Sequence, residues 1–241
     1  MIRDTLEDTD ITSSIDLDPA ALPRVDLGED TLQLDGEGTP GDPSVIDLRE
    51  EPEKLGRDYQ KLWLATAVTN LGDGVRVAAL PLLAATLTRD PLFISGVLFA
   101  SKLPWLLFSL HSGAIVDRVD RRSLIVRVNL LRALVMGIFG ITLATGSGSL
   151  WLLYSIALLQ GIGEVFSDNA SFALMPKLVP RTRLEAANGR LEAAIVVFNG
   201  FAGPALGSLL FVAATAAPFA LDASTFLVSA LVMLSIAPAA K

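Results

Sequence analysis

The sequence predicts an all-α integral membrane protein in which six transmembrane helices follow an acidic segment. Of the 241 residues, 51% are hydrophobic and only 19% are charged, whereas a soluble domain usually carries about 25% charged residues. Long apolar runs alternate with short polar breaks from Lys61 onward. The charge is also divided unequally along the chain.

Residues 1–53 contain sixteen acidic and three basic residues, a net charge of −13, whereas residues 54–241 carry a net charge of +6. The acidic segment is rich in Gly and Pro and poor in aromatic residues, so it cannot bury enough apolar surface to offset its conformational entropy. It lacks the basic start and apolar centre of a signal peptide. We expect residues 1–56 to form a disordered acidic cytoplasmic tail, or a docking segment, and residues 57–241 to form the membrane domain.

A helix needs about 20 predominantly apolar residues to cross ~30 Å of hydrocarbon. Six runs meet this requirement, at roughly 60–87, 92–115, 123–146, 149–175, 185–213 and 215–237. Polar or turn-forming residues separate them, at 88–91, after Asp117, at 146–148, at 176–183 and, least distinctly, near Ala214. Pro81, Pro104 and Pro204 fall inside runs, where neighbouring helices can satisfy the freed carbonyls.

The basic residues of the short loops predict the orientation, because cytoplasmic loops carry an excess of Lys and Arg. One side of the membrane receives only Arg89. The other receives ten basic residues: Lys54, Arg57, Lys61, Arg118, Arg121, Arg122, Lys177, Arg181, Arg183 and Lys241. We expect a multi-pass protein of the inner or plasma membrane with both termini in the cytoplasm.

Two of the runs carry polar residues at membrane depth, where an ionisable group is by default a functional hypothesis. In the first run, Asn70, Asp73 and Arg76 are three residues apart and share a helix face. In the fourth, the polar positions also share one face: Gln160, Glu164, Ser167, Asp168 and Ser171. We expect the two stripes to line one water-filled cavity that holds substrate or coupling protons.

The alternative is that these charges only neutralise one another. Asp73 would then pair with Arg76 on its own helix, and Arg127 or Arg132 would reach Glu164 or Asp168. Lys102 is either a cation of the cavity or the partner of a further acid. Asp222 is interpreted as the cap of a shortened sixth helix, and His111 as an interfacial residue.

The residue types and their spacing predict no enzyme and no catalytic residue. The chain has no cysteine, which removes disulfides and thiolate metal sites. It contains no phosphate-binding Gly-Lys-Ser/Thr loop, no His-Glu-x-x-His pair and no catalytic triad elements. We therefore expect no metal and no cofactor. The basic residues are those of cytoplasmic loops, so no nucleic-acid partner is expected either.

The loop after the second run reads Gly113-Ala-Ile-Val-Asp117-Arg118-Val-Asp-Arg121-Arg122. It resembles the signature loop of the major facilitator superfamily, Gly-x-x-x-Asp-Arg followed by a basic pair, with Asp120 where the commoner pattern has Gly. The resemblance implies a conformational switch in which Asp117 faces a helix N-terminus or the guanidinium groups.

The fifth run contains Gly203-Pro204-Ala-Leu-Gly207, which resembles the helix-packing element of the superfamily's drug and metabolite antiporters. Gln160-Gly161-x-Gly163 matches part of a further antiporter motif, whose expected Arg is Ala157 here. Asn70-Leu-Gly-Asp-Gly74 and the segments at 80–82, 103–105 and 186–189 are similar to the enterobactin-exporter-like and macrolide-efflux-like branch. The resemblance covers residues 58–237.

This resemblance implies two inverted three-helix repeats and a substrate bound at the midplane between two six-helix halves. The chain corresponds to the N-terminal half alone, so we expect a second half from the same gene, from a separate chain or from a homodimer. The expected function is proton-coupled efflux of small amphipathic molecules such as drugs or siderophores. Protonation of Asp73, Glu164 or Asp168 would bias the transport cycle. The alternative is a non-transporting membrane scaffold, or a half-subunit that assembles with a separate chain.

Overall fold

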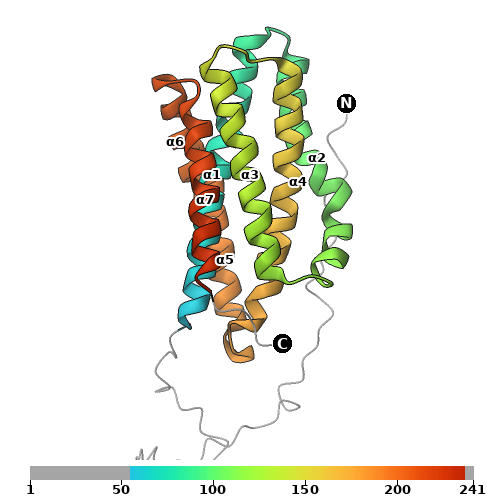
Figure 1. Cartoon of the computed structure of the whole chain (residues 1–241), viewed down its shortest axis with the longest axis vertical. Coiled ribbons are helices and arrows are strands. Elements are labelled where there is room, and N and C mark those ends of the chain that lie inside the picture. Colours follow the sequence, from blue (N-terminus) through green and yellow to red (C-terminus); the bar gives the residue numbers. More distant parts are fainter. Residues whose placement is uncertain (1–54, 237–241) are drawn as a thin grey trace, which may run out of the picture. The chain divides into compact units, whose positions relative to one another are not determined.

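The computed structural model describes residues 55–236, and every regular element in that range is helical (Figure 1). The prediction of a disordered tail falls on residues that lie, except for the last two, outside the described range. The helices are α1 (Arg57–Leu87), α2 (Pro91–Val116), α3 (Arg121–Ala144), α4 (Leu150–Leu174), α5 (Leu184–Val197), α6 (Gly203–Ala213) and α7 (Ala217–Leu234). Short 3₁₀ turns at Met175–Lys177 and Arg181–Arg183 connect α4 to α5.

The fifth predicted span consists of three consecutive helical pieces. A π-helical turn, η3 (Phe198–Ala202), joins α5 to α6, so that helical geometry runs from Leu184 to Ala213. Gly203 separates this turn from Pro204, which has no N–H to donate. The N–H of Gly203 donates to the carbonyl of Phe198, five residues earlier. The six predicted runs therefore correspond to six long helical segments.

Side-chain caps explain where three of the helices begin. Asp90, Asp120 and Ser149 each accept a hydrogen bond from a backbone N–H of the first turn, that of Leu92, Ser123 and Leu152 respectively. Such caps satisfy donors that the helix itself leaves free. The turn after α3 contains Gly146 with φ 75°, a conformation that favours glycine.

Five of the six segments are long and apolar enough to cross a membrane: α2, α3, α4 with its following turn, the α5–α6 segment and α7. The sequence predicted six, and α1 is the exception. With 31 residues it is about 46 Å long, but it carries buried polar and charged groups, among them Asn70, Asp73 and Arg76. Other helices surround these groups, so α1 does not need an apolar surface throughout.

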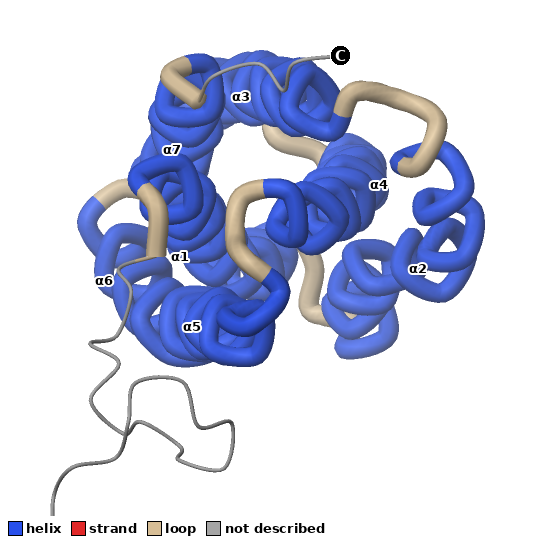
Figure 2. The backbone as a smooth tube through the Cα atoms, turned by 90° about the horizontal axis from the view of Figure 1, so that it is seen from below, coloured by secondary structure: helices blue, strands red, loops and turns tan. Residues whose placement is uncertain are grey.

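The packing of the helices repeats within the bundle, as the end-on view illustrates (Figure 2). Helix α1 packs against the α5–α6 segment and α7, α4 packs against α2 and α3, and α3 packs against α7. These relations map onto themselves when α1 is exchanged with α4, α2 with α5–α6, and α3 with α7. In the contacts that they make, the first three segments therefore correspond to the last three.

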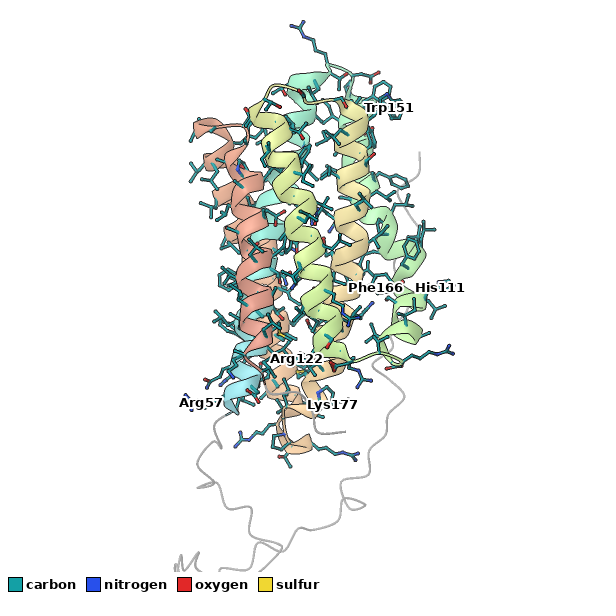
Figure 3. All side chains as sticks on the ribbon, in the orientation of Figure 1. Arg57, His111, Arg122, Trp151, Phe166 and Lys177 are labelled. Carbon is teal, nitrogen blue, oxygen red and sulfur yellow. The ribbon has the colours of Figure 1, made fainter. Side chains whose placement is uncertain are left out.

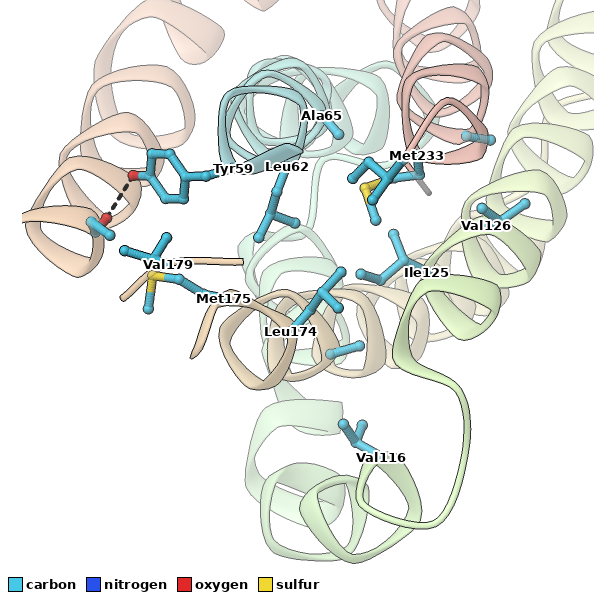
Figure 4. Packing of buried hydrophobic residues seen from close by; sticks show 14 residues of the cluster. Tyr59, Leu62, Ala65, Val116, Ile125, Val126, Leu174, Met175, Val179 and Met233 are labelled. Atoms are coloured by element: carbon cyan, nitrogen blue, oxygen red, sulfur yellow. Dashed lines mark hydrogen bonds between the residues drawn. The ribbon is translucent and has the colours of Figure 1, made fainter. Parts of the chain in front are cut away.

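The interior is divided into two apolar layers with a polar layer between them. One apolar cluster lies at the end where α1 begins and includes Tyr59, Leu62, Leu174 and Met233 (Figure 4). The other lies toward the opposite end and includes Leu80, Phe139, Leu153 and Phe219. Most of the buried polar residues lie on α1, α3, α4 and α7, between these clusters.

The labelled basic residues Arg57, Arg122 and Lys177 lie at the same end of the bundle, and Trp151 lies at the other end (Figure 3). His111 is exposed on the outer side of α2 (Figure 3). The basic loops thus lie at one end of the bundle and the loop of Arg89 lies at the other, as expected when successive spans alternate in direction.

Candidate functional site

A network of buried charges occupies the polar layer, with Asp73 at its centre. The same oxygen of Asp73, Oδ1, accepts hydrogen bonds at 2.5 Å from Arg76 Nη2 and from Arg132 Nη2. The side chains of all three residues are at most 3% exposed. Arg76 belongs to the same helix as Asp73, whereas Arg132 extends from α3, so the pair of guanidinium groups ties α1 to α3.

Arg76 also contacts two further carboxylates on other helices. Its Nη2 donates to Glu164 Oε2 at 2.9 Å, and its Nε lies 3.4 Å from Asp222 Oδ2. One guanidinium group therefore connects α1, α4 and α7. A buried charge is tolerated when it is paired and hydrogen-bonded. The fully buried Arg76 meets this condition through its contacts with three carboxylates.

Arg132 is fixed by a reciprocal contact with α4. Its Nε donates to Gln160 Oε1 at 3.1 Å, and Gln160 Nε2 donates to the carbonyl of Arg132 at 3.1 Å. The guanidinium carbon also lies 4.0 Å from the centre of the Phe226 ring, a cation–π arrangement. Gln160 thus orients Arg132 toward Asp73.

A cavity of about 470 Å³ lies beside the network, between α2, α4 and the α5–η3 segment. Its lining combines charged and polar residues with aromatic ones: Lys102, Glu164, Asp168, Glu192, Asn199, Trp105 and Phe172. Glu164 belongs to both regions. Its Oε2 bonds to Arg76, while its Oε1 accepts from Trp105 Nε1 at 3.4 Å and lies 3.8 Å from Lys102 Nζ.

The two predicted polar stripes occupy different positions relative to this cavity. Glu164 and the half-buried Asp168 line it, whereas Asp73 and Arg76 lie behind Glu164 in the network. Asn70 is one contact away, because Asn199 Nδ2, which lines the cavity, donates to Asn70 Oδ1 at 3.2 Å. Of the two stripes expected to share one cavity, the α4 stripe lines it with Glu164 and Asp168 only, and the α1 stripe does not line it.

The ion pairs that the sequence allowed are present in part. Asp73 pairs with Arg76, as one alternative had it, but Arg132 pairs with Asp73 rather than with Glu164 or Asp168. Arg127 is exposed on α3 and has no ion-pair partner among residues 55–236. Lys102 faces the cavity with a side chain that is 59% exposed.

The interpretation of Asp222 as a helix cap is wrong. Helix α7 begins at Ala217, so Asp222 lies in its second turn, fully buried and next to Arg76. Neither of its oxygens accepts a hydrogen bond from a described residue. The signal that sequence reasoning missed is a third polar stripe, Asp222, Thr225 and Ser229, with the spacing of one helix face.

A second, uncharged contact joins three helices nearer the basic end. Asn129 on α3 donates to Ser229 Oγ on α7 at 3.0 Å and accepts from Ser167 Oγ on α4 at 3.3 Å. All three residues are buried. Ser167 of the predicted α4 stripe therefore serves this contact and does not line the cavity.

The loop predicted as a conformational switch makes contacts at the basic end. Asp117 Oδ1 accepts from Arg121 Nη2 at 3.0 Å. Arg122 donates from Nε to the carbonyl of Met233 at 3.0 Å and from Nη2 to that of Leu234 at 2.7 Å, which caps the end of α7. Arg118 and Gly113 are not part of these contacts.

Asp120, which stands where the commoner pattern has Gly, begins α3. Its Oδ2 accepts hydrogen bonds from the Ser123 hydroxyl at 2.8 Å and from the Ser123 N–H at 3.1 Å. The hydroxyl contact is the main reason why the pKa of Asp120 is lowered from its ordinary value. The substitution of Gly by Asp in this loop thus supplies a helix cap.

Two glycines of the predicted packing element lie against α1. A Cβ at Gly203 would stand 2.7 Å from the Cα of Gly74 and 2.8 Å from the carbonyl oxygen of Leu71. A Cβ at Gly207 would meet the backbone of Val75. Pro204 lies between them at the start of α6. The close approach of these helices brings Asn199 to Asn70 and closes one side of the site.

Comparison with known proteins agrees with these features. Residues 56–241 match the family described as transmembrane secretion effector, a branch of the major facilitator superfamily. A region of 135 residues is 33% identical to an uncharacterized MFS-type transporter of Mycobacterium tuberculosis, covering 54% of this chain and 30% of the relative.

Two macrolide efflux proteins are also similar. Macrolide efflux protein A of Streptococcus pyogenes is 22% identical over 153 residues, which is 64% of this chain and 38% of that protein. Macrolide efflux protein A of Enterococcus faecalis is 26% identical over 109 residues, 45% of this chain and 33% of that protein. The matched region spans about a third of the length of these relatives.

Proposed function

Because this chain belongs to the transmembrane secretion effector family of the major facilitator superfamily, we propose that it is the N-terminal six-helix half of a secondary transporter that exports small amphipathic molecules. The position of Glu164 carries the proposal. One oxygen of this carboxylate faces the cavity and the other bonds to the buried Arg76. A ligand in the cavity and the charge state of the network therefore act on the same group.

We infer proton coupling from the carboxylates that hold the buried Arg76. Asp73, Glu164 and Asp222 all contact its guanidinium group, and Glu164 also lies 3.8 Å from Lys102 Nζ. A proton added to Glu164 or Asp73 would remove one of these negative charges and weaken the contact with Arg76. Asp168, which lines the cavity next to Glu164, is the group from which such a proton would arrive.

The internal exchange pattern of the helices supports the proposal of two inverted three-helix repeats over residues 57–241. In transporters built this way, the substrate lies near the midplane between two halves, and one half rocks against the other. The cavity described above is lined by residues of α2, α4, α5 and η3. A second six-helix half would enclose it.

The second half is the principal partner of this proposal. It would come from the same polypeptide, a separate chain or a second copy, in keeping with relatives about three times as long as the matched region. Helix α2 exposes many large apolar side chains, including Leu106 at 77% and Leu110 at 84% exposure. The bilayer and the second half would share this surface.

The orientation proposed from the loops places the basic end in the cytoplasm. The positive-inside rule applies to short loops close to the spans, and Arg57, Arg122 and Lys177 lie at that end (Figure 3). Both ends of the membrane domain would then be cytoplasmic.

Transport is tested on the protein in its natural assembly. The chromosomal gene is tagged, the tagged protein is purified in mild detergent with any partner retained, and the sample is reconstituted into proteoliposomes. Uptake of a radiolabelled macrolide is then measured with and without an imposed proton gradient. Uptake that requires the gradient and stops with a protonophore is expected. Gradient-independent uptake would overturn proton coupling, and no uptake of any amphipathic probe would overturn the transport assignment.

Glu164→Gln tests the residue that carries the proposal. Loss of its charge should reduce gradient-driven uptake by about tenfold or more, because typical couplings between sites amount to 5- to 150-fold. Glu185→Gln is the matched control, since Glu185 is an exposed acid in the first turn of α5 and does not line the cavity. Equal uptake by the two variants would remove Glu164 from the mechanism.

A further inference from the structure

A second groove, of about 770 Å³, lies between the start of α1 and α5 at the basic end of the bundle. It shares no lining residue with the cavity beside the charge network. The groove has no role in the proposed transport site or in the switch loop.

The groove is basic near the start of α5 and apolar farther along this helix. Arg183, at the end of the 3₁₀ turn before α5, and Arg190, within α5, both line the groove. Ala193, Val197 and Phe198 line the groove one to two turns farther from the basic end. A phospholipid has the same order of groups, with an anionic phosphate at the interface and acyl chains below it.

Two hydrogen bonds fix the walls of the groove. The Tyr59 hydroxyl donates to the carbonyl of Ala187 at 2.8 Å (Figure 4), and Trp63 Nε1 donates to the carbonyl of Arg190 at 3.0 Å. Both aromatic residues line the groove. Aromatic side chains of this type are enriched at the level of lipid headgroups.

The arginine side chains of the groove are available for a ligand. Neither Arg183 nor Arg190 forms an ion pair with an acidic residue in the described part of the chain. A planar guanidinium group matches the geometry of a phosphate, to which it can donate two parallel hydrogen bonds. Two such groups beside an apolar channel select for an amphipathic anion.

We propose that this groove binds an anionic phospholipid, with its phosphate at Arg183 and Arg190 and an acyl chain along Ala193, Val197 and Phe198. Basic pockets between transmembrane helices recognise anionic headgroups in this way. The bound lipid would join α1 to α5 at the membrane surface. This inference depends on the membrane location of the chain and not on its transport activity.

The test compares two lipids of identical acyl chains on the full chain purified in detergent. Binding of phosphatidylglycerol and of phosphatidylcholine is titrated by native mass spectrometry. The wild-type chain should bind phosphatidylglycerol about 25-fold more tightly, since each of two basic residues near a membrane surface contributes about 1 kcal/mol, roughly fivefold in affinity. Arg183→Gln/Arg190→Gln should abolish this preference. Arg57→Gln/Arg181→Gln should retain it, because these exposed residues of the same end lie outside the groove.

A second variant tests the apolar part of the groove without changing its charge. Ala193→Trp places a large side chain at an exposed position of the groove and should weaken the binding of phosphatidylglycerol while leaving the thermal unfolding temperature unchanged. Excess inorganic phosphate should not displace the lipid. Equal affinity for the two lipids, an equal loss in the Arg57 and Arg181 control, or displacement by phosphate would each overturn the proposal. None of these outcomes alters the expectation for macrolide uptake.

Discussion

At the scale of single residues, Asp73 determines the arrangement of the buried charges. A single carboxylate oxygen accepts from two guanidinium groups that belong to different helices. Without this negative charge, Arg76 and Arg132 would repel each other in a region that excludes water. The cost of removing one partner of a buried ion pair is about 3–5 kcal/mol, because the remaining charge stays buried without compensation.

Asp73→Asn is therefore expected to lower the free energy of unfolding of the chain in detergent by about 3–5 kcal/mol. Asp58→Asn is the matched control on the same helix. Asp58 pairs with Lys61 at 3.0 Å, but its side chain is 39% exposed, and exposed pairs contribute about 0–1 kcal/mol. Denaturant unfolding of the two variants gives the comparison. Similar losses would mean that the network is not the main source of local stability.

The sequence revealed individual members of the site but not their partners. The spacing of Asn70, Asp73 and Arg76 and that of Gln160 and Glu164 identified two polar helix faces. The spacing of residues within one helix gives no information on how two helices are rotated relative to each other. It therefore did not predict that Arg132 pairs with Asp73. Asp222 was missed because it was interpreted as the cap of a shortened sixth helix, whereas α7 begins five residues before it, at Ala217.

At the scale of helices, close packing depends on glycines that face backbone. Gly203 meets Gly74 and Leu71 of α1, whereas a Cβ at Gly200, three residues earlier, would meet nothing within 4 Å. The two positions belong to the same helical segment and differ mainly in what lies opposite them.

Gly203→Ala is expected to destabilise the chain by about 1–3 kcal/mol, the usual cost of overpacking. Gly200→Ala is the matched control and should be neutral within about 0.5 kcal/mol or slightly stabilising, since alanine restricts the unfolded chain. Thermal unfolding in detergent micelles measures both. If the two variants unfold at the same temperature, α6 does not approach α1 as closely as the structure has it.

The cap at Asp120 gives the start of α3 a dependence on pH. The pKa of this carboxyl is lowered in the folded chain, so its stabilisation is present at neutral pH and is lost as the pH falls through the lowered value, below about 4. Hydrogen exchange at the amides of Ser123 and Leu124 should then accelerate beyond its intrinsic pH dependence.

The start of α4 provides an internal control for this effect. Its cap is Ser149, whose hydroxyl does not titrate in this range, and the amide of Leu152 should keep its protection on acidification. Asp120→Asn should remove the difference between the two helices. Parallel loss of protection at both helix starts would point to general unfolding in acid.

Element boundaries were the most predictable part of the fold. Apolar runs and polar breaks placed the ends of the helices within a few residues, and the weak break near Ala214 matches the gap between α6 and α7. The π-helical turn at 198–202 was not predicted, because it arises from the contact of Phe198 and Asn199 with Gly74 as well as from Pro204. Helix α1 was counted among the six apolar runs, and its contacts with the other helices explain why it carries more polar residues than they do.

At the scale of the whole membrane domain, the absence of cysteine from the sequence makes the orientation directly measurable. Arg89→Cys and Arg118→Cys each introduce one thiol at an exposed loop position, on opposite sides of the predicted membrane. In intact cells, a membrane-impermeant maleimide should label the first variant and not the second. Lysed cells serve as the control, in which both should react. Labelling of Arg118→Cys from outside would reverse the orientation.

The shared guanidinium group of Arg76 has a mechanical consequence. Sliding α1 along α4 or α7 would separate the Arg76 guanidinium group from its carboxylate partners and leave a buried charge unpaired. These helices therefore resist relative sliding more strongly than apolar contacts alone would allow. The domain should therefore move as one rigid body. If it transports as proposed, the conformational change would take place at its boundary with the proposed second half.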